Sequence, residues 1–185
     1  MIPAGYMYKQ VAMRPEWLKA TPRIKDIFSL SGCISRNFAD YINHWQHNGL
    51  WMFDKPEIMR AIAQKDGIDL AGMTLFYYEV FEKEFRERDG GWASLIIKDF
   101  PMNVAEPASK TLCGYDVATF WAGSSAECSP LSCNHLCEKI SVNEHCLFDS
   151  FEQAELDLNN GLFVDCEPGP YRIFAVYTVD EVAAG

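Results

Sequence analysis

The sequence lacks the long apolar runs that mark membrane proteins. No stretch approaches the ~20 consecutive apolar residues that cross a bilayer. Residues 1–8 also lack the basic stretch and apolar core of an export signal. We therefore expect a soluble cytoplasmic protein without membrane contact. The hydrophobic content of 49% and the aromatic content of 14% exclude a disordered chain and predict a globular one.

Basic residues are scarce in the second half of the chain. Residues 93–185 contain 4 Lys and Arg against 14 Asp and Glu, whereas residues 1–92 contain 12 of each kind. The net charge of −10 therefore lies in the second half. Because an acidic surface repels phosphate groups, we expect no direct nucleic-acid binding. The same charge would attract a protein partner with a basic surface.

The sequence contains no Cys-x-x-Cys pair, although it has seven cysteines. An odd number of cysteines without an export signal argues against a disulfide framework. A Cys/His cluster spans residues 128–146, but its spacings differ from those of the familiar zinc sites. We expect no cofactor, and zinc binding by this cluster is the alternative.

One short pattern occurs twice. Asn, Phe, Asp and Glu stand at positions 48, 53, 54 and 57, and again 95 residues later at 143, 148, 149 and 152. Each block leads into a helical pattern that a glycine ends, Gly67 in the first case and Gly161 in the second. A pattern repeated at a constant offset predicts a duplicated structural unit.

The hydrophobic periodicity predicts an α+β fold built as a single compact domain of residues 1–185. Each half reads as strand, helix, short strand, helix, strand, over about 24–85 and 111–180, with a linker at 101–109. The two halves should share one mixed or antiparallel sheet of about six strands, with helices packed on it. The predicted helices cover about 35–47, 54–66, 129–140 and 151–160, and the longer strands cover 24–30, 73–85, 111–121 and 171–179.

Two cysteines are candidate nucleophiles. Cys33 and Cys128 each follow a Ser/Gly-containing loop and precede a predicted helix, where the helix dipole lowers a thiol pKa. His135 is the nearby candidate base. This pattern favours a small enzyme or ligand-binding protein with a cleft between the halves. The alternative is that Cys133 and Cys137 belong to an apolar helical stripe and are only buried.

Three further sets of residues have the chemistry of binding sites. Ser31 and Ser35, in a loop before a predicted helix, suit an anion. Arg172 is the only Arg after residue 88, and it is either an anion anchor or the partner of a carboxylate. Asp40, His44 and His47 would share one face of the helix predicted at 35–47, as either a metal site or a solvated surface.

The leading functional hypothesis from the sequence is a non-enzymatic, acidic protein-binding module of the inhibitor or immunity type. It depends on the charge asymmetry and on the lack of a coherent catalytic set, and it requires a partner with a basic surface. The cysteine-dependent enzyme or ligand-binding protein and the zinc protein are the alternatives.

Overall fold

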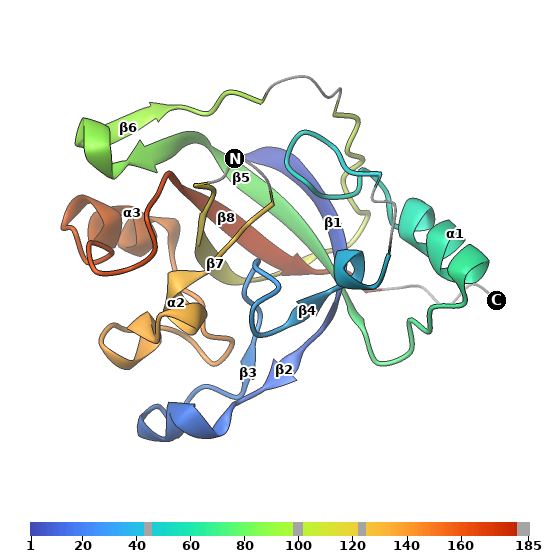
Figure 1. Cartoon of the computed structure of the whole chain (residues 1–185), viewed down its shortest axis with the longest axis horizontal. Helices are drawn as coiled ribbons and strands as arrows, with labels where there is room; N and C mark the ends of the chain where they lie inside the picture. The colour runs from blue at the N-terminus through green and yellow to red at the C-terminus, as the bar shows by residue number, and fades with distance from the viewer. Residues whose placement is uncertain (43–45, 98–101, 122–124, 181–185) are drawn as a thin grey trace.

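A strongly curled antiparallel sheet with few helices forms the core of the α+β structure (Figure 1). The computed structural model describes residues 1–42, 46–97, 102–121 and 125–180. The main sheet has six strands, and all its pairs are antiparallel. Its order is β4 (Arg36–Asn37), β1 (Ile2–Gln10), β5 (Thr74–Arg86), β8 (Tyr171–Thr178) and β7 (Thr111–Thr119), with β6 (Gly91–Ser94) paired to β5.

A second, two-stranded sheet joins β2 (Ala12–Met13) to β3 (Asp26–Ile27). The strand predicted over 24–30 is therefore only two residues long. Its flanks instead bond to the second half of the chain, where Lys25 N donates to Glu144 O and Phe28 N donates to His145 O. The β-strand is short because only Asp26 and Ile27 pair with β2, whereas Lys25 and Phe28 bond to Glu144 and His145.

Three α-helices are present in the described residues: α1 (Pro56–Asp66), α2 (Pro130–Cys133) and α3 (Phe151–Asn159). Local signals explain the two longer ones. Pro56 opens α1, and Gly67 ends it in the left-handed conformation, with φ of 69°. The Ser150 hydroxyl caps α3 by accepting from Gln153 N. None of the described helices is long and apolar enough to cross a membrane.

Two of the predicted helices do not form. Over 35–47, Arg36 and Asn37 pair with β1, so the described part contains only a 3₁₀ turn at Phe38–Tyr41, and Ile42 is extended. Over 129–140, α2 stops after one turn because His135 takes the left-handed conformation with φ of 58°. The other 3₁₀ turns lie at Glu16–Ala20, Glu87–Asp89 and Leu136–Glu138.

The buried side chains form two hydrophobic clusters. The first gathers residues of β1, β5 and α1, and the second gathers residues of β7, β8, α2 and α3. Leu18, Ile24 and Ile27 come from the N-terminal segment but belong to the second cluster. Residues near the start of the chain therefore pack against elements of the second half of the sequence.

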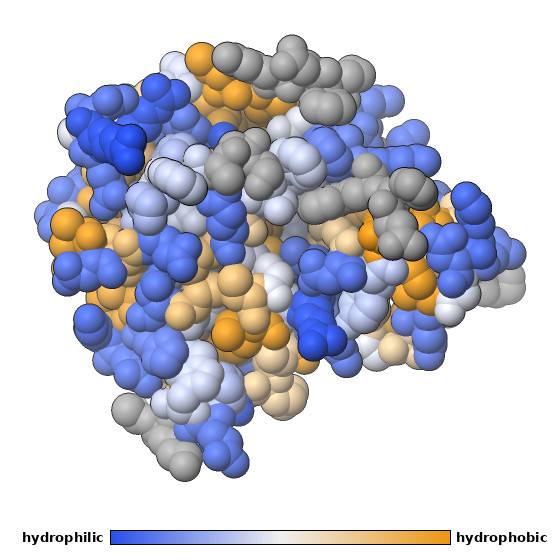
Figure 2. Space-filling model, viewed as in Figure 1, coloured by the Kyte–Doolittle hydropathy of each residue, from blue (hydrophilic) through white to orange (hydrophobic). Residues whose placement is uncertain are grey.

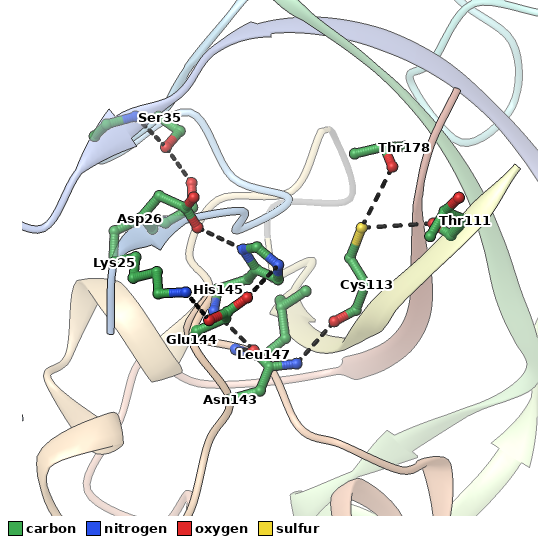
Figure 3. Close-up of polar contacts among 12 residues, drawn as sticks. Lys25, Asp26, Ser35, Thr111, Cys113, Asn143, Glu144, His145, Leu147 and Thr178 are labelled. Atoms are coloured by element: carbon green, nitrogen blue, oxygen red, sulfur yellow. Dashed lines mark hydrogen bonds and ion pairs between the residues drawn. The ribbon is translucent and has the colours of Figure 1, made fainter. Parts of the chain in front are cut away.

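The two blocks of the repeated pattern make the same hydrogen bonds. Asn48 Nδ2 donates to Ala4 O at 2.8 Å, and Asn48 Oδ1 accepts from the backbone N–H groups of Leu50 and Met52. Asn143 Nδ2 donates to Cys113 O at 2.7 Å, and Asn143 Oδ1 accepts from the backbone N–H groups of His145 and Leu147 (Figure 3). Each asparagine thus ties its own loop to a strand of the main sheet, β1 for Asn48 and β7 for Asn143.

The phenylalanines of the two blocks also occupy matching positions. Phe53 forms an isolated antiparallel bridge with Tyr6 of β1, and Phe148 forms one with Tyr115 of β7. The residue before each tyrosine is a glycine at a register shift of the strand, with φ of 140° at Gly5 and 142° at Gly114. Only glycine adopts this φ freely and lets the asparagine loop approach so closely.

Candidate functional site

A buried lysine and a buried aspartate hold the Leu30–Ser31 segment between them. Lys9 Nζ, on β1, donates to Leu30 O at 3.1 Å and to Ser31 O at 3.0 Å, and also to Asn37 Oδ1. Asp116, on β7, accepts from Leu30 N and from the Ser129 hydroxyl, each at 2.7 Å. Strands β1 and β7, which flank the central β5–β8 pair, therefore fix one loop.

Burial shifts the pKa values of both charged groups. It lowers the pKa of Lys9 to about 7, although the charge of Asp116 acts in the opposite direction. It raises the pKa of Asp116 to about 6, against the hydrogen bonds from Leu30 and Ser129. A buried charge is tolerated only when it is paired and hydrogen-bonded, so this arrangement is costly unless every contact is made.

Three cysteines lie beside this loop. The Cys33 thiol donates to Glu127 O at 3.1 Å, the Cys128 thiol donates to Asn134 Oδ1 at 3.2 Å, and Cys133 Sγ lies beside Ser31. The hydroxyl of Ser31 lies 3.4 Å from the same sulfur. Cys33 is exposed, Cys133 is half-buried and Cys128 is buried. We call Cys33, Cys128 and Cys133 the thiol cluster.

The thiol cluster favours a single thiolate on Cys133. Hydrogen bonds from Cys128 and Cys33 lower the pKa of Cys133 well below its ordinary value, and burial only partly opposes them. The Ser31 hydroxyl and the Ser129 N–H add to this effect. The pKa values of Cys33 and Cys128 are raised, because each thiol is hydrogen-bonded to Cys133 and burial disfavours their charged forms. The directions of these pKa shifts favour Cys133 as the ionised thiol of the three.

The two predicted nucleophiles have different hydrogen-bond partners, Glu127 O for Cys33 and Asn134 Oδ1 for Cys128. The predicted base His135 is not part of that site, since its ring stacks on Trp17 at a centroid distance of 3.9 Å. No hydrogen bond joins its ring to a thiol in the described part of the chain. The left-handed turn at His135 directs the chain away from α2.

The predicted anion-binding residues have separate roles. Ser31 belongs to the site just described, where its backbone N–H donates to Ser129 Oγ at 3.2 Å. Ser35 lies apart from it, because its hydroxyl donates to Ile27 O and accepts from Ala12 N. Arg172 donates to Glu84 Oε2 at 3.1 Å, so the prediction that it pairs with a carboxylate is confirmed.

The geometry that suggested a metal site at Asp40, His44 and His47 is not formed. Asp40 belongs to the 3₁₀ turn, where its carboxylate accepts from Asn37 N at 2.9 Å. His47 lies outside any helix and stacks on Trp51, and His44 falls outside the described residues. The helical row that would have aligned the three side chains therefore has no structural basis in the described residues.

The Cys/His cluster of residues 128–146 divides into separate environments. Cys137 and Cys146 form a buried thiol pair in the second hydrophobic cluster. His145 Nδ1 lies 2.6 Å from Asp26 Oδ1 (Figure 3). The His145 ring also stacks on Phe28. Within the described ranges, no group of three or more His, Cys, Asp or Glu side chains has a geometry that could hold a metal ion.

Sequence reasoning missed three residues of the site. Lys9 and Asp116 are charged residues inside otherwise apolar strands, and that pattern was the available signal. Cys133 was assigned to an apolar helical stripe, although the helix that would carry the stripe ends at this residue. The comparisons add no functional evidence: no family model, curated protein or solved structure shows a significant match to the chain.

Proposed function

We propose that the protein carries out cysteine-dependent chemistry, with the thiolate of Cys133 as the nucleophile. The observation that carries the proposal is the Ser31 hydroxyl 3.4 Å from the half-buried Cys133 Sγ, together with the lowered pKa of Cys133 and the raised pKa values of Cys33 and Cys128. A thiolate is the reactive form of cysteine, and hydrogen-bond donors around a sulfur increase the fraction of that form. This develops the cysteine alternative from the sequence and moves the nucleophile from Cys33 or Cys128 to Cys133.

In this proposal, the positioning residues are Ser31, Ser129, Lys9 and Asp116. Ser31 lies in the loop that Lys9 holds, and Ser129 opens the single turn of α2 that presents Cys133. Ser129 also donates its hydroxyl to Asp116. A nucleophile held by packed and hydrogen-bonded neighbours keeps its donors in place without reorganisation.

Alkylation with iodoacetamide tests the proposed nucleophile. At pH 5.5 roughly a thousandth of an ordinary thiol is ionised, whereas the lowered pKa of Cys133 should leave a much larger fraction of it ionised. Because a thiolate of low pKa is intrinsically less nucleophilic, we expect Cys133 to react about tenfold faster than the other cysteines at this pH. Its rate should change little between pH 5.5 and 8.

Peptide mass spectrometry after timed quenching measures each cysteine separately. The fast phase should disappear in Cys133→Ser and persist in Cys166→Ser, which changes a half-buried cysteine outside the cluster. A Cys133 rate that rises tenfold per pH unit, as for an ordinary thiol, would refute the proposal.

We also infer that the two halves of the chain are copies of one structural unit. The matched asparagine loops, phenylalanine bridges and strand glycines support this inference. The unit then begins with β1 in the first half, earlier than the boundary at residue 24, because Gly5 and Tyr6 are the counterparts of Gly114 and Tyr115.

A second candidate function is binding of a basic protein partner through the surface at the end of α3. Leu156, Leu162 and Val164 are 52%, 43% and 72% exposed there. Figure 2 shows hydrophobic atoms among hydrophilic ones over this region, at the left edge. Residues 149–168 contain six Asp and Glu and no Lys or Arg. An apolar centre with an acidic surround complements a partner with basic residues around an apolar contact.

A synthetic amphipathic peptide of Lys and Leu can probe this surface. Its fluorescence anisotropy should report binding that weakens with salt and weakens at least about tenfold in Leu156→Ser/Val164→Ser. The control is Met13→Ser, which removes a side chain that is 72% exposed on β2. Equal affinity for both variants would exclude the α3 surface as the binding site.

A further inference from the structure

We propose that Tyr77, Tyr177 and Glu79 form a binding site for primary alkylammonium groups, and that Lys110 is its displaceable internal occupant. We call the first three residues the ammonium cage. The cage shares no residue with the Cys133 site, so it is tested independently of the proposed function. Its ligand class follows from the contacts that the ammonium group of Lys110 makes.

Three tyrosines lie side by side on one face of the main sheet. Tyr77 of β5 pairs in register with Tyr6 of β1 and with Tyr177 of β8. Because directly opposite side chains of an antiparallel pair share a face, their rings are neighbours, with centroids 5.1 Å apart for Tyr6–Tyr77 and 5.9 Å apart for Tyr77–Tyr177. Glu79 follows Tyr77 by two residues and projects from the same face, where its Oε2 accepts from the Tyr177 hydroxyl at 3.0 Å.

The cage is built on the two central strands of the sheet. Strand β5 lies between β1 and β8, and β8 lies between β5 and β7 (Figure 1). Backbone pairing on both sides therefore holds the cage residues in place whether or not a cation lies among them. A site whose geometry exists before its ligand arrives loses less entropy on binding.

Lys110 makes the contacts of a bound ligand. Its Nζ lies 4.8 Å from the centroid of the Tyr77 ring and 4.6 Å from that of Tyr177, and it donates to Glu79 Oε1. Aromatic faces around a cation are the arrangement by which proteins recognise alkylammonium ligands. Because the ammonium also donates to Glu79, the cage favours a primary ammonium, which has three N–H donors, over a quaternary one, which has none.

The position of Lys110 allows it to leave the cage. Lys110 ends the segment 102–110, which contains no helix or strand, and its side chain is 24% exposed. Its side chain can swing into solvent without breaking the strand pairing that forms the cage. An ammonium group from outside the chain can then take the same contacts.

The charge around Lys110 favours such an exchange. Its Nζ contacts Glu79 and also lies 3.4 Å from Glu106 Oε2, so two carboxylates share one cation. Burial acts to lower the pKa of Lys110, but the two carboxylates outweigh it and raise this pKa, so the ammonium stays charged. The buried hydroxyl of Tyr77 has no hydrogen-bond partner in the described part of the chain. Surplus negative charge and an unsatisfied polar group both favour a cationic donor as ligand.

NMR of the full-length protein with isotope-labelled lysine tests the displacement. The Lys110 methylene next to the amine lies near two ring faces, so its proton signal should be shifted upfield, and Lys110→Arg identifies the signal by its loss. Added n-butylammonium, the lysine side chain without its backbone, should move this signal toward that of free lysine. Tetramethylammonium at the same ionic strength should move it at least about tenfold less. Equal effects of the two cations would overturn the proposal.

Lys110→Ala removes the competing occupant and opens the cage. We expect n-butylammonium to bind this variant at least about tenfold more tightly than the wild type and to raise its melting temperature by several degrees. This stabilisation should disappear in Lys110→Ala/Glu79→Gln and persist in Lys110→Ala/Glu82→Gln, because Glu82 is an exposed residue of the same strand. Equal affinities for the wild type and Lys110→Ala would refute Lys110 as the occupant. The NMR titration of the wild type decides the proposal even where the variant does not fold.

The peptide acetyl-Gly-Lys-Gly-amide distinguishes the two sources of an ammonium group. If the peptide binds Lys110→Ala about as tightly as n-butylammonium does, the cage takes lysine side chains of a partner chain. If the peptide binds at least about tenfold more weakly, the cage takes free amines. Both results support an alkylammonium site, whereas binding of neither probe would refute it.

Discussion

Gly114→Ala should destabilise the protein by about 3 to 5 kcal/mol. An added Cβ would lie 2.6 Å from Phe148 O and 2.8 Å from Asn143 Nδ2, and these atoms belong to the loop that the asparagine holds. The backbone φ of 142° is also strained for alanine. Strain of this kind costs about 1–3 kcal/mol, and overpacking adds about 1–3 kcal/mol. Urea unfolding of the two proteins measures the difference.

The same substitution in the first half provides a second copy of the experiment. At Gly5 an added Cβ would lie 2.6 Å from Met52 Cβ and 2.9 Å from Phe53 O, so Gly5→Ala should cost a similar amount. Gly161→Ala is the matched control, because φ is 72° but nothing lies within 4 Å of the added atom. It should cost only about 1–2 kcal/mol. Equal losses at Gly114 and Gly161 would show that the close approach of the asparagine loop is unimportant.

Lys9→Met should destabilise the protein by about 3 to 5 kcal/mol. Methionine replaces the aliphatic stem but leaves the oxygens of Leu30, Ser31 and Asn37 without their buried donor. It also removes a cation whose charge acts on the fully buried Asp116. Removal of one partner from a buried charged network is costly because the other charge stays in place. Lys65→Met, at an exposed position of α1, should have almost no effect.

The pH dependence separates the charge of Lys9 from its packing. The folded pKa of Lys9 is about 7, below the ordinary 10.5, so the unfolded chain holds this proton more tightly between these values. Stability therefore rises with pH across this window, by at most about 1.4 kcal/mol per pH unit. Between pH 7 and pH 9, the urea midpoint of the wild type should rise relative to that of Lys9→Met. A constant difference would mean that Lys9 keeps its proton throughout this range.

Elements with short-range signals could be predicted from the sequence. Alternation gave the long strand that became β5, and Gly67 marked the C-terminal end of α1. The helix begins at Pro56, two residues after the start predicted at residue 54. The Ser150 cap likewise located α3. The helix over 129–140 could not be excluded in this way, because its periodicity is helical while the left-handed turn at His135 interrupts the backbone. Periodicity describes which face would be apolar, not whether the turns continue.

Only part of the candidate site was predictable from the sequence. The physical reason for the arrangement of its residues also differs from the predicted one. Cys33 and Cys128 were selected for their places before helices, yet in the described residues only a 3₁₀ turn follows Cys33 over 35–47 and only a single α-helical turn follows Cys128. Lys9 and Asp116 instead fix the Leu30–Ser31 segment against Ser129, and this places Ser31 beside Cys133. That network joins strands more than 100 residues apart, so no local pattern contains it.

The sequence by itself determined the repeated asparagine pattern, the charge imbalance and the ends of the two longer helices, because each depends on residues a few positions apart or on a simple count. Only the tertiary structure decided that Lys9 is buried, that Asp116 faces it across a loop and that the distant Ser31 hydroxyl lies beside Cys133 Sγ. The physical reason is that burial and hydrogen bonding set the charge of these groups. Both depend on neighbours that folding brings from elsewhere in the chain.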